Sequence, residues 1–380
     1  MSWSRCSRRI IDVCEVIAGQ SPEGKYYNKD GEGLPFYQGK KEFNDREIGE
    51  PTIWTKKTTK EAFSGDILMS VRAPVGPINL STQHICIGRG LAAIRASKKV
   101  NRDYLFYYLL KHESEIVGNT GAVFNSINKN QIGNIPIPIP PIEEQKQIVA
   151  LLDQAFTAID QAKANIEKNI VNAKELFQSK LNAIFSQKGD GWEEKSLGEV
   201  CENLDNKRIP ITKNKRVSGE IPYYGASGIV DYVADYIFDE DLLLVSEDGA
   251  NLLARKYPIA FSISGKNWVN NHAHALKFQN MTSQIFIEYY LNSIKLDDYI
   301  SGMAQPKLNQ RMLNSILVPF PSIEIQEKIV FMVKKLSIHT KSVNNQYQQK
   351  IINLEELKKS ILQKAFSGAL TQKEVVVLVS

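Results

Sequence analysis

Two stretches of the chain decide its organisation: Ile135-Pro136-Ile137-Pro138-Ile139-Pro140-Pro141-Ile142-Glu143-Glu144-Gln145 and Val318-Pro319-Phe320-Pro321-Ser322-Ile323-Glu324-Ile325-Gln326. Each proline fixes its own φ and disfavours helix at the preceding residue, so both stretches begin as extended backbone. Helix becomes possible after the last proline, because Ser322 can cap the second helix and the glutamates place negative charge in both first turns. Each stretch therefore predicts a connector that leads into a helix.

An internal duplication surrounds these connectors. Residues 120–186 align with residues 301–367 at a constant offset of 181 without a gap, and 18 of the 67 pairs are identical. Farther upstream, Val13-Cys14-Glu15 recurs as Val200-Cys201-Glu202, and Leu34-Pro35-Phe36-Tyr37 as Ile221-Pro222-Tyr223-Tyr224, both at an offset of 187. The chain is therefore predicted to contain two copies of one unit, each with a globular part, a proline connector and a helix.

Beyond each connector, apolar residues recur at alternating spacings of three and four. They are Ile148, Leu152, Ala155, Ile159, Ala162, Ile166, Ile170, Ala173, Leu176 and Ile184 in the first copy, and Ile329, Val333, Leu336, Val343, Tyr347, Ile351, Leu354, Leu357, Ile361 and Ala365 in the second. Such a narrow stripe is typical of a helix that pairs with another helix. At a rise of 1.5 Å per residue, a helix of about 44 residues is roughly 65 Å long.

Two such helices in one chain most simply pair with each other. If a pseudo-two-fold axis relates the tandem copies, the helices run antiparallel and the globular parts lie at opposite ends of the pair. A spacer or self-association coiled coil with no further role is the alternative interpretation of the same stripe.

Strand and helix signals alternate within each globular part. Apolar runs at residues 66–71, 90–95, 241–246 and 273–278 are bounded by polar turns, and helical segments follow at 102–111 and 283–293. The predicted fold class is α+β: two mixed α/β domains in tandem, separated by two long helices that form an antiparallel coiled coil, with pseudo-two-fold symmetry.

Composition restricts the class of protein. The chain has 380 residues, 43% hydrophobic and 23% charged, as in a globular protein of two or three domains. No apolar run approaches the ~20 residues that span a bilayer, so we expect a cytoplasmic protein without a membrane partner. The four cysteines are scattered, which argues against a disulfide framework or a structural zinc site.

The net charge of +5 is unevenly distributed along the chain. Lys and Arg outnumber Asp and Glu by 19 to 14 over residues 1–140, whereas the balance is 14 to 17 over residues 188–321. Any contact of the second copy with nucleic acid must therefore come from local clusters of basic residues.

Catalytic motifs are missing from the sequence. It contains no Asn-Pro-Pro-Tyr or Asp-Pro-Pro-Tyr methyltransferase motif, no G-x-x-x-x-G-K-S/T phosphate loop and no G-x-G-x-x-G fingerprint. Asp190, Glu193 and Lys195 loosely match the spacing of a metal-dependent nuclease, but they lie on the turn between the copies. His272 and His274 could bind a metal from one face of a strand, yet no cysteine or carboxylate constellation accompanies them. We expect neither a cofactor nor a metal.

The second helix closes with Ala365-Phe366-Ser367-Gly368-Ala369-Leu370. With this ending and its two connector and helix stretches, the chain resembles the specificity subunits of type I restriction-modification systems over nearly its whole length. The resemblance implies two target recognition domains, residues 1–140 and 188–321, joined through helical segments 141–187 and 322–370. Each domain would read one half of a bipartite double-stranded DNA site. The helices would serve as spacer and as docking surface for two methyltransferase subunits, with restriction subunits as further partners, and the chain itself would be non-catalytic.

Basic side chains in loops are the candidate DNA contacts. Lys and Arg bind phosphate oxygens, and Arg can hold a guanine edge with two hydrogen bonds. Lys307 replaces Ser126 at one repeat position, as differing specificities would produce. The candidates are Lys56, Lys57, Lys60, Arg72 and Arg89 in the first copy, and Lys213, Lys215, Arg216, Arg255, Lys256, Asn267 and Lys307 in the second.

Two other functions stay open at this point. One is a coiled-coil adaptor that organises other proteins without reading DNA, and the other is a DNA-processing enzyme with an unrecognised site. A footprint with two protected patches and a gap favours the specificity subunit, whereas S-adenosylmethionine binding by the isolated chain favours the enzyme.

Overall fold

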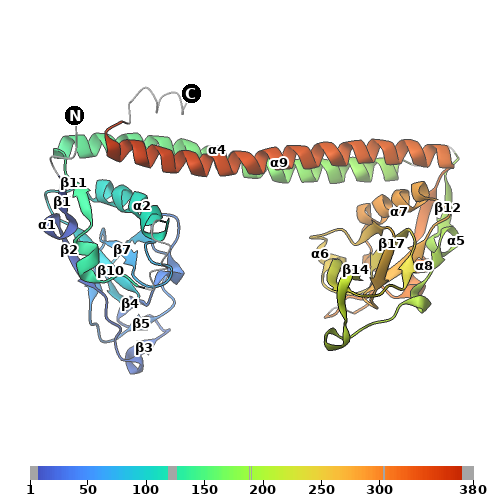
Figure 1. Cartoon of the computed structure of the whole chain (residues 1–380), viewed down its shortest axis with the longest axis horizontal. Helices are drawn as coiled ribbons and strands as arrows, with labels where there is room; N and C mark the ends of the chain where they lie inside the picture. The colour runs from blue at the N-terminus through green and yellow to red at the C-terminus, as the bar shows by residue number, and fades with distance from the viewer. Residues whose placement is uncertain (1–6, 119–125, 188, 190, 303, 370–380) are drawn as a thin grey trace. The chain divides into compact units, whose positions relative to one another are not determined.

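The computed structural model describes residues 7–118, 126–187, 189, 191–302 and 304–369, so the apolar tail at 375–379 lies outside the described residues. The chain forms two units, of which unit 1 contains residues 1–166 and 349–380 and unit 2 contains residues 167–348. Each unit combines one globular part with segments of two long helices, α4 (Ile142–Ser186) and α9 (Ile323–Ser367) (Figure 1).

The globular part of unit 1 contains two sheets. One has the strand order β2-β10-β7-β8 with antiparallel neighbours throughout, and the other has the order β3-β5-β4-β9-β6 with a parallel β4-β9 pair. The strands are β2 (Cys14–Ala18), β3 (Tyr27–Asn28), β4 (Leu34–Tyr37), β5 (Trp54–Thr55), β6 (Glu61–Ala62), β7 (Ile67–Ser70), β8 (Ile78–Leu80), β9 (Ile85–Ile87) and β10 (Leu91–Ala96). The helices are α1 (Ile10–Val13), α2 (Arg102–Gly118) and α3 (Lys129–Gly133).

Unit 2 repeats this plan. Its sheets have the orders β13-β20-β17-β18 and β15-β14-β19-β16, and the β14-β19 pair is again parallel. The strands are β13 (Glu202–Asn203), β14 (Ser218–Gly225), β15 (Gly228–Val233), β16 (Phe238–Asp239), β17 (Leu242–Ser246), β18 (Ala260–Ile263), β19 (Lys266–Val269) and β20 (Ala273–Lys277). The helices are α5 (Leu197–Val200), α6 (Asn251–Ala254), α7 (Met281–Ser293) and α8 (Gln310–Asn314).

The predicted elements are confirmed, with boundaries that mostly differ by one or two residues. The four predicted strands correspond to β7, β10, β17 and β20, and both long helices begin at the predicted residue. The larger difference is α2, which continues to Gly118 although the apolar pattern predicted an end at Lys111.

The proline connectors form short strands, as their extended backbone predicts. β11 (Pro136–Pro138) pairs antiparallel with β1 (Ser7–Arg9), and β21 (Leu317–Phe320) pairs antiparallel with β12 (Glu193–Ser196). Proline lacks the N–H that an interior strand needs, but both strands of a two-stranded pair are edge strands and tolerate it. Each pair therefore joins the start of a copy to the start of its long helix.

A buried glutamine in the first turn fastens each long helix to its globular part. Gln145 accepts a hydrogen bond from the Asn101 backbone N–H at 2.7 Å and donates to a connector proline carbonyl at 2.8 Å. Gln326, at the same repeat position, accepts from the Ser283 hydroxyl at 2.8 Å and also donates to a connector proline carbonyl at 2.8 Å. Both side chains are buried, so these hydrogen bonds replace contacts with water.

The end of each long helix packs on the globular part of the other copy. In unit 1, Phe366 of α9 lies edge-on to Tyr104 and Tyr108 of α2, with both ring centroids 5.2 Å from its own. At the same repeat position, Phe185 of α4 makes the equivalent two contacts with α7 in unit 2, at 5.3 Å. Each core therefore contains residues from both copies.

Within each unit, the segments of α4 and α9 run antiparallel. In unit 1, Asp160 pairs with Lys358 and Lys163 pairs with Glu355, so residue numbers rise along α4 as they fall along α9. The shared core of unit 2 shows the same order in the residues Leu181 and Phe185 of α4 and Ile329, Val330 and Val333 of α9.

The predicted apolar stripe is confirmed with one exception. Every predicted stripe residue of α9 is at least partly buried, and so are those of α4 except Leu176. Leu176 is 58% exposed, because the inward-facing positions near the end of α4 shift by one residue to Phe177 and Leu181.

Replacing Gln326 by Ala is expected to lower the free energy of unfolding of unit 2 by about 2 kcal/mol, because the Ser283 hydroxyl and a proline carbonyl lose their buried partner. Urea unfolding of the full chain measures the change. The matched control Gln346→Ala removes an exposed glutamine of the same helix and should stay within about 0.5 kcal/mol of the wild type. Equal effects of the two substitutions would contradict the role given to Gln326.

Candidate DNA interface

Four of the candidate residues of unit 1 lie in loops at the strand ends of one sheet. Lys56 and Lys57 follow β5, Lys60 precedes β6, and Arg89 follows β9, which are three strands of the five-stranded sheet. All four side chains are exposed. In Figure 1, β3, β4 and β5 form the part of unit 1 that lies farthest from α4. The fold therefore collects residues that are up to 33 positions apart in sequence on one sheet.

Lys25 and Lys57 lie over one aromatic ring, that of Tyr26. Lys56 pairs with Glu32, and its backbone N–H donates to the Tyr26 carbonyl at 3.1 Å. The Lys57 ammonium lies 5.4 Å from the centre of the Tyr26 ring, and the Lys25 ammonium lies 5.1 Å from it. Positive charge around a partly exposed aromatic ring is a combination that suits phosphate and base contacts.

Arg89 is held by a tightly packed loop. A Cβ atom on Gly88 would lie 2.8 Å from the Gln38 Oε1, and one on Gly90 would lie 2.4 Å from the Gln38 carbonyl oxygen. The Arg89 backbone N–H donates to the Ser21 hydroxyl at 3.2 Å. The backbone is therefore fixed while the guanidinium projects from it, and this side chain forms no ion pair with the residues that the structure describes.

Arg72 and Lys307 each belong to an isolated β-bridge that occurs once in each copy. Arg72 forms an isolated antiparallel bridge with Ser126 in unit 1, and Asp248 forms the same bridge with Lys307 in unit 2. The bridge confirms that Ser126 and Lys307 share a repeat position, as the sequence alignment predicted. Each copy thus places one basic residue at this loop, but on opposite sides of the bridge.

Three candidates in unit 2 are engaged inside the protein. The Arg216 guanidinium pairs with Asp231 at 2.9 Å and lies over an aromatic ring at 4.3 Å. Arg255 has a φ of 50° at the end of α6 and donates to the carbonyls of Leu291 and Ile294, near the end of α7, and burial lowers its pKa. Asn267 is fully buried and donates to the Gly265 carbonyl at 2.7 Å. We therefore leave these three side chains out of the proposed interface.

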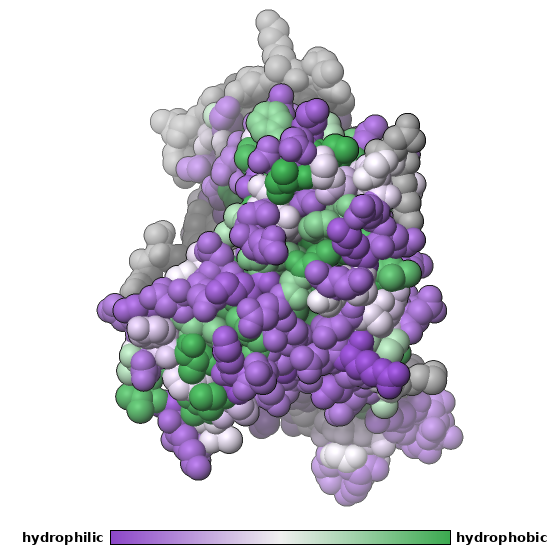
Figure 2. All heavy atoms as spheres, turned by 90° about the vertical axis from the view of Figure 1, so that its right-hand side faces the viewer, coloured by the Kyte–Doolittle hydropathy of each residue, from purple (hydrophilic) through white to green (hydrophobic). Residues whose placement is uncertain are grey.

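The remaining candidates of unit 2 are exposed. Lys213 and Lys215 lie on a short helical turn, Lys256 follows α6, and Lys307 reaches Glu247 at 3.1 Å. Within the described part of the chain, neither Lys213, Lys215 nor Lys256 forms an ion pair. The face of unit 2 toward the viewer in Figure 2 is mainly hydrophilic, with small patches of hydrophobic side chains between the polar ones.

A buried network of charged side chains lies beneath Lys307. His274 is fully buried, and its ring nitrogens lie 2.5 Å from the Asp205 carboxylate and 2.7 Å from the Leu308 carbonyl oxygen. Both ring nitrogens of His274 therefore face oxygen atoms that accept hydrogen bonds. Arg208 contacts Asp205 at 3.2 Å and Glu247 at 2.8 Å.

The cations of this network keep its carboxylates ionised. Burial acts to raise the pKa of Asp205, but the hydrogen bond and charge of His274 outweigh it and hold that pKa below its ordinary value. Burial also acts to raise the pKa of Glu247, but the hydrogen bond from Arg208 and the charge of His274 hold it low. Asp205, Glu247 and His274 lie close enough together to hold a metal ion. The side chains of Arg208, His274 and Lys307, however, already neutralise both carboxylates. His272 is exposed and pairs with a different carboxylate, that of Asp248, at 2.7 Å.

The sequence analysis missed this network because the first copy does not contain it. In unit 1 the sheet pairs Ala18 of β2 with Ala92 of β10, whereas in unit 2 Asp205, just after β13, bonds to His274 of β20. The pair of Asp205 and His274 becomes apparent only when the strands of the two copies are aligned, because the two residues form no spaced motif in the sequence.

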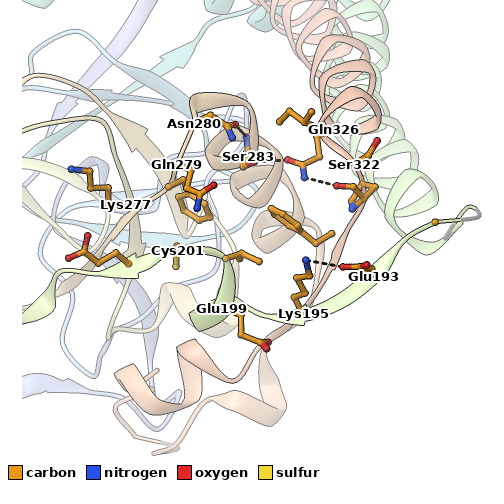
Figure 3. Close-up of a pocket in the computed structure, with 17 residues that line it drawn as sticks. Glu193, Lys195, Glu199, Cys201, Lys277, Gln279, Asn280, Ser283, Ser322 and Gln326 are labelled. Atoms are coloured by element: carbon orange, nitrogen blue, oxygen red, sulfur yellow. Dashed lines mark hydrogen bonds and ion pairs between the residues drawn. The ribbon is translucent and has the colours of Figure 1, made fainter.

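A pocket of about 770 Å³ in unit 2 lies apart from the candidate DNA contacts (Figure 3). It is lined by residues of β12, the end of β20, and the starts of α7 and α9, and none of the twelve candidates lines it. Glu193 and Lys195 pair with each other at 2.8 Å on its wall, and Asp190 lies outside the described residues. The nuclease hypothesis gains no support from this arrangement.

Sequence comparison assigns the chain to a family. The sequence model of a type I restriction modification DNA specificity domain matches residues 6–171 and again residues 189–359. The chain belongs to this type I restriction-modification specificity family. The double match supports the specificity interpretation rather than a coiled-coil adaptor. No helix in the described ranges has the length and apolar character that crossing a membrane requires.

Individual members of the specificity family resemble the chain over different lengths. A putative type I restriction enzyme specificity subunit of Methanocaldococcus jannaschii is 44% identical over 170 residues, which cover 44% of this chain and 39% of that protein. The MjaIX specificity subunit of the same organism is 23% identical over 97% of this chain and 94% of its own length. A solved chain from a type I restriction-modification system has the same fold, with a TM-score of 0.75 at 19% identity over 96% of this chain and 98% of that one.

Replacing Asp205 by Ala is expected to destabilise unit 2 by about 3 kcal/mol at pH 7, because the buried charges of His274 and Arg208 lose a partner. The folded pKa of Asp205 is lowered, so its contribution is present at pH 7 and is lost as the pH falls below about 4. Urea unfolding at pH 7 and pH 3 should therefore show a smaller difference between variant and wild type at pH 3. The exposed Asp239→Ala is the control, and a difference independent of pH would contradict the ionised network.

Proposed function

We propose that the chain is a non-catalytic DNA reader that recognises a bipartite double-stranded site, one half-site with the globular part of each unit. Methyltransferase subunits, two of them, and restriction subunits bind to it and supply the chemistry. The site of action is the cytoplasm. The domain limits proposed for the two readers are residues 1–140 and 188–321, with the helical segments 141–187 and 322–370 as their connection.

One observation carries this proposal: the two copies share one fold but differ in the side chains that their loops expose. At the repeated bridge, a basic residue lies on one side in unit 1, as Arg72, and on the other side in unit 2, as Lys307. Readers of two different half-sites need a common scaffold with different contacts, whereas an adaptor has no such need. The proposed DNA contacts are Lys56, Lys57, Lys60, Arg72 and Arg89 in unit 1, and Lys213, Lys215, Lys256 and Lys307 in unit 2.

Mapping of methylated sites tests the function directly. Cells that contain this chain and its partner methyltransferase should carry a two-part methylated motif with a spacer of constant length. A motif without a gap, or methylation that does not depend on this chain, would refute the proposal.

Replacement of Lys56, Lys57 and Lys60 together by Gln should weaken DNA binding regardless of sequence and reduce its salt dependence. Each lost phosphate contact lowers the slope of log K against log salt by about 0.9, because fewer counterions are released. Titrations of the chain with its methyltransferase at several salt concentrations measure the slope. Replacement of the exposed Lys98, Lys99 and Lys129 removes the same charge from unit 1 and should change the slope less. Equal slopes for the two triple variants would show that Lys56, Lys57 and Lys60 are only solvated.

Exchange of residues 1–140 for the corresponding part of another family member should change one half of the methylated motif and leave the other half and the spacer unchanged. The physical reason is that the strands of each globular part pair only with one another, so each part has its own sheets and its own exposed loops. Methylated-motif mapping reads both halves in one experiment. A change in both halves after a single exchange would contradict independent reading.

A further inference from the structure

The hairpin of β14 and β15 in unit 2 exposes apolar side chains at a sheet edge. Gly225 pairs with Gly228, so only two residues connect the strands, and β15 is the outer strand of its sheet. On β15, Ile229 is 48% exposed, Val230 is 55% exposed and Tyr232 is 50% exposed. Edge strands usually carry charged residues or prolines that discourage pairing, so an apolar edge indicates a surface with a binding partner.

Basic residues flank this edge. Lys213 and Lys215 precede Arg216, which is packed against the hairpin by its ion pair with Asp231 and its position over the Tyr223 ring. On β19, which β14 separates from β15, the ammonium of Lys266 lies 4.7 Å from the centre of the Tyr236 ring. Asp231, the acidic residue of β15, is thereby paired, whereas Glu220 on β14 and Asp235 after β15 remain exposed. The edge is an apolar strip with lysines beside it, which is complementary to a polyanion with apolar groups.

The equivalent strand of unit 1, β5, is not an edge strand, because β3 pairs with its outer side. Pro35 pairs with Trp54 on β5 as Pro222 pairs with Tyr232 on β15, so these two aromatic residues occupy equivalent places. In unit 1, however, the strand continues into Lys56 and Lys57. Equivalent strands that share an aromatic residue but differ in exposure and in their neighbouring side chains are expected of two readers with different half-sites.

We propose that β15 enters the major groove of the half-site read by unit 2, where Ile229, Val230 and Tyr232 contact thymine methyl groups and Lys213, Lys215 and Lys266 contact the flanking phosphates. A two-stranded ribbon fits the major groove, and apolar side chains recognise the thymine methyl there. The exposed carboxylates of Glu220 and Asp235 are compatible with this position, because carboxylates accept hydrogen bonds from the cytosine amino group. The inference rests on the proposed function and assigns the kind of base that unit 2 reads.

The double substitution Ile229→Gln and Val230→Gln tests this assignment, because glutamine offers no methyl group to thymine. Both side chains are about half exposed, so the variant is expected to fold. Methylated-motif mapping should show relaxed recognition of thymine in the half-site of unit 2, identified by the domain exchange, and an unchanged second half-site. Leu317→Gln, at an equally exposed apolar residue on β21, is the matched control and should leave the motif unchanged.

Uracil in place of thymine provides a second readout. In a duplex that contains the mapped motif, loss of one contacted methyl group should weaken binding of the wild-type complex about fourfold and leave the double variant unaffected. A half-site of unit 2 without thymine, or a variant that keeps both the motif and the sensitivity to uracil, would overturn the inference. So would loss of subunit co-purification with an unchanged motif, since the edge would then bind protein. Absence of any two-part motif with the wild-type chain would instead refute the proposed function itself.

Discussion

The exchange of helix ends between the copies is the contact on which the rest of the structure depends. Phe366 comes from the second copy and fills the core of unit 1, while Phe185 comes from the first copy and fills the core of unit 2. Fully buried side chains of this size contribute about 1.5–3 kcal/mol each. Neither globular part can therefore complete its core without the other copy's helix, which explains why the duplication includes the helix as well as the sheets.

The starts of the helices impose the complementary constraint. The prolines force each connector into a strand, and the buried amides of Gln145 and Gln326 then orient the first helical turn. The two copies hold both ends of each long helix with the same residue types. The loops at the strands far from the helices are therefore free to differ between the copies. Lys56 and Lys57 follow β5 in unit 1, whereas the equivalent strand of unit 2, β15, is an edge strand that carries Ile229 and Val230.

Periodic features of this fold could be predicted from the sequence, because they repeat a local rule many times. The long helices and the four central strands could each be predicted from the pattern of apolar residues alone. Leu176 nevertheless faces solvent, because the pattern does not reveal the shift of the inward-facing positions by one residue near the end of α4. The candidate contacts were harder to predict. Arg255 and Asn267 have the residue types of DNA contacts, but distant parts of the chain, the end of α7 and the interior of the sheet, use or bury them.

The buried network of unit 2 shows how the fold that both copies share can support a different loop surface in each. Where unit 1 places Ala18 beside Ala92, unit 2 places Asp205 beside His274, and the resulting charges extend through Glu247 to the exposed Lys307. An isolated buried charge would be costly, but a network in which every charge has a partner can be accommodated without moving the strands. Buried side chains of the sheet therefore influence which side chains the loop exposes. A change of half-site by drift in the loops alone would leave Glu247 without Lys307, so loop and interior residues are expected to change together.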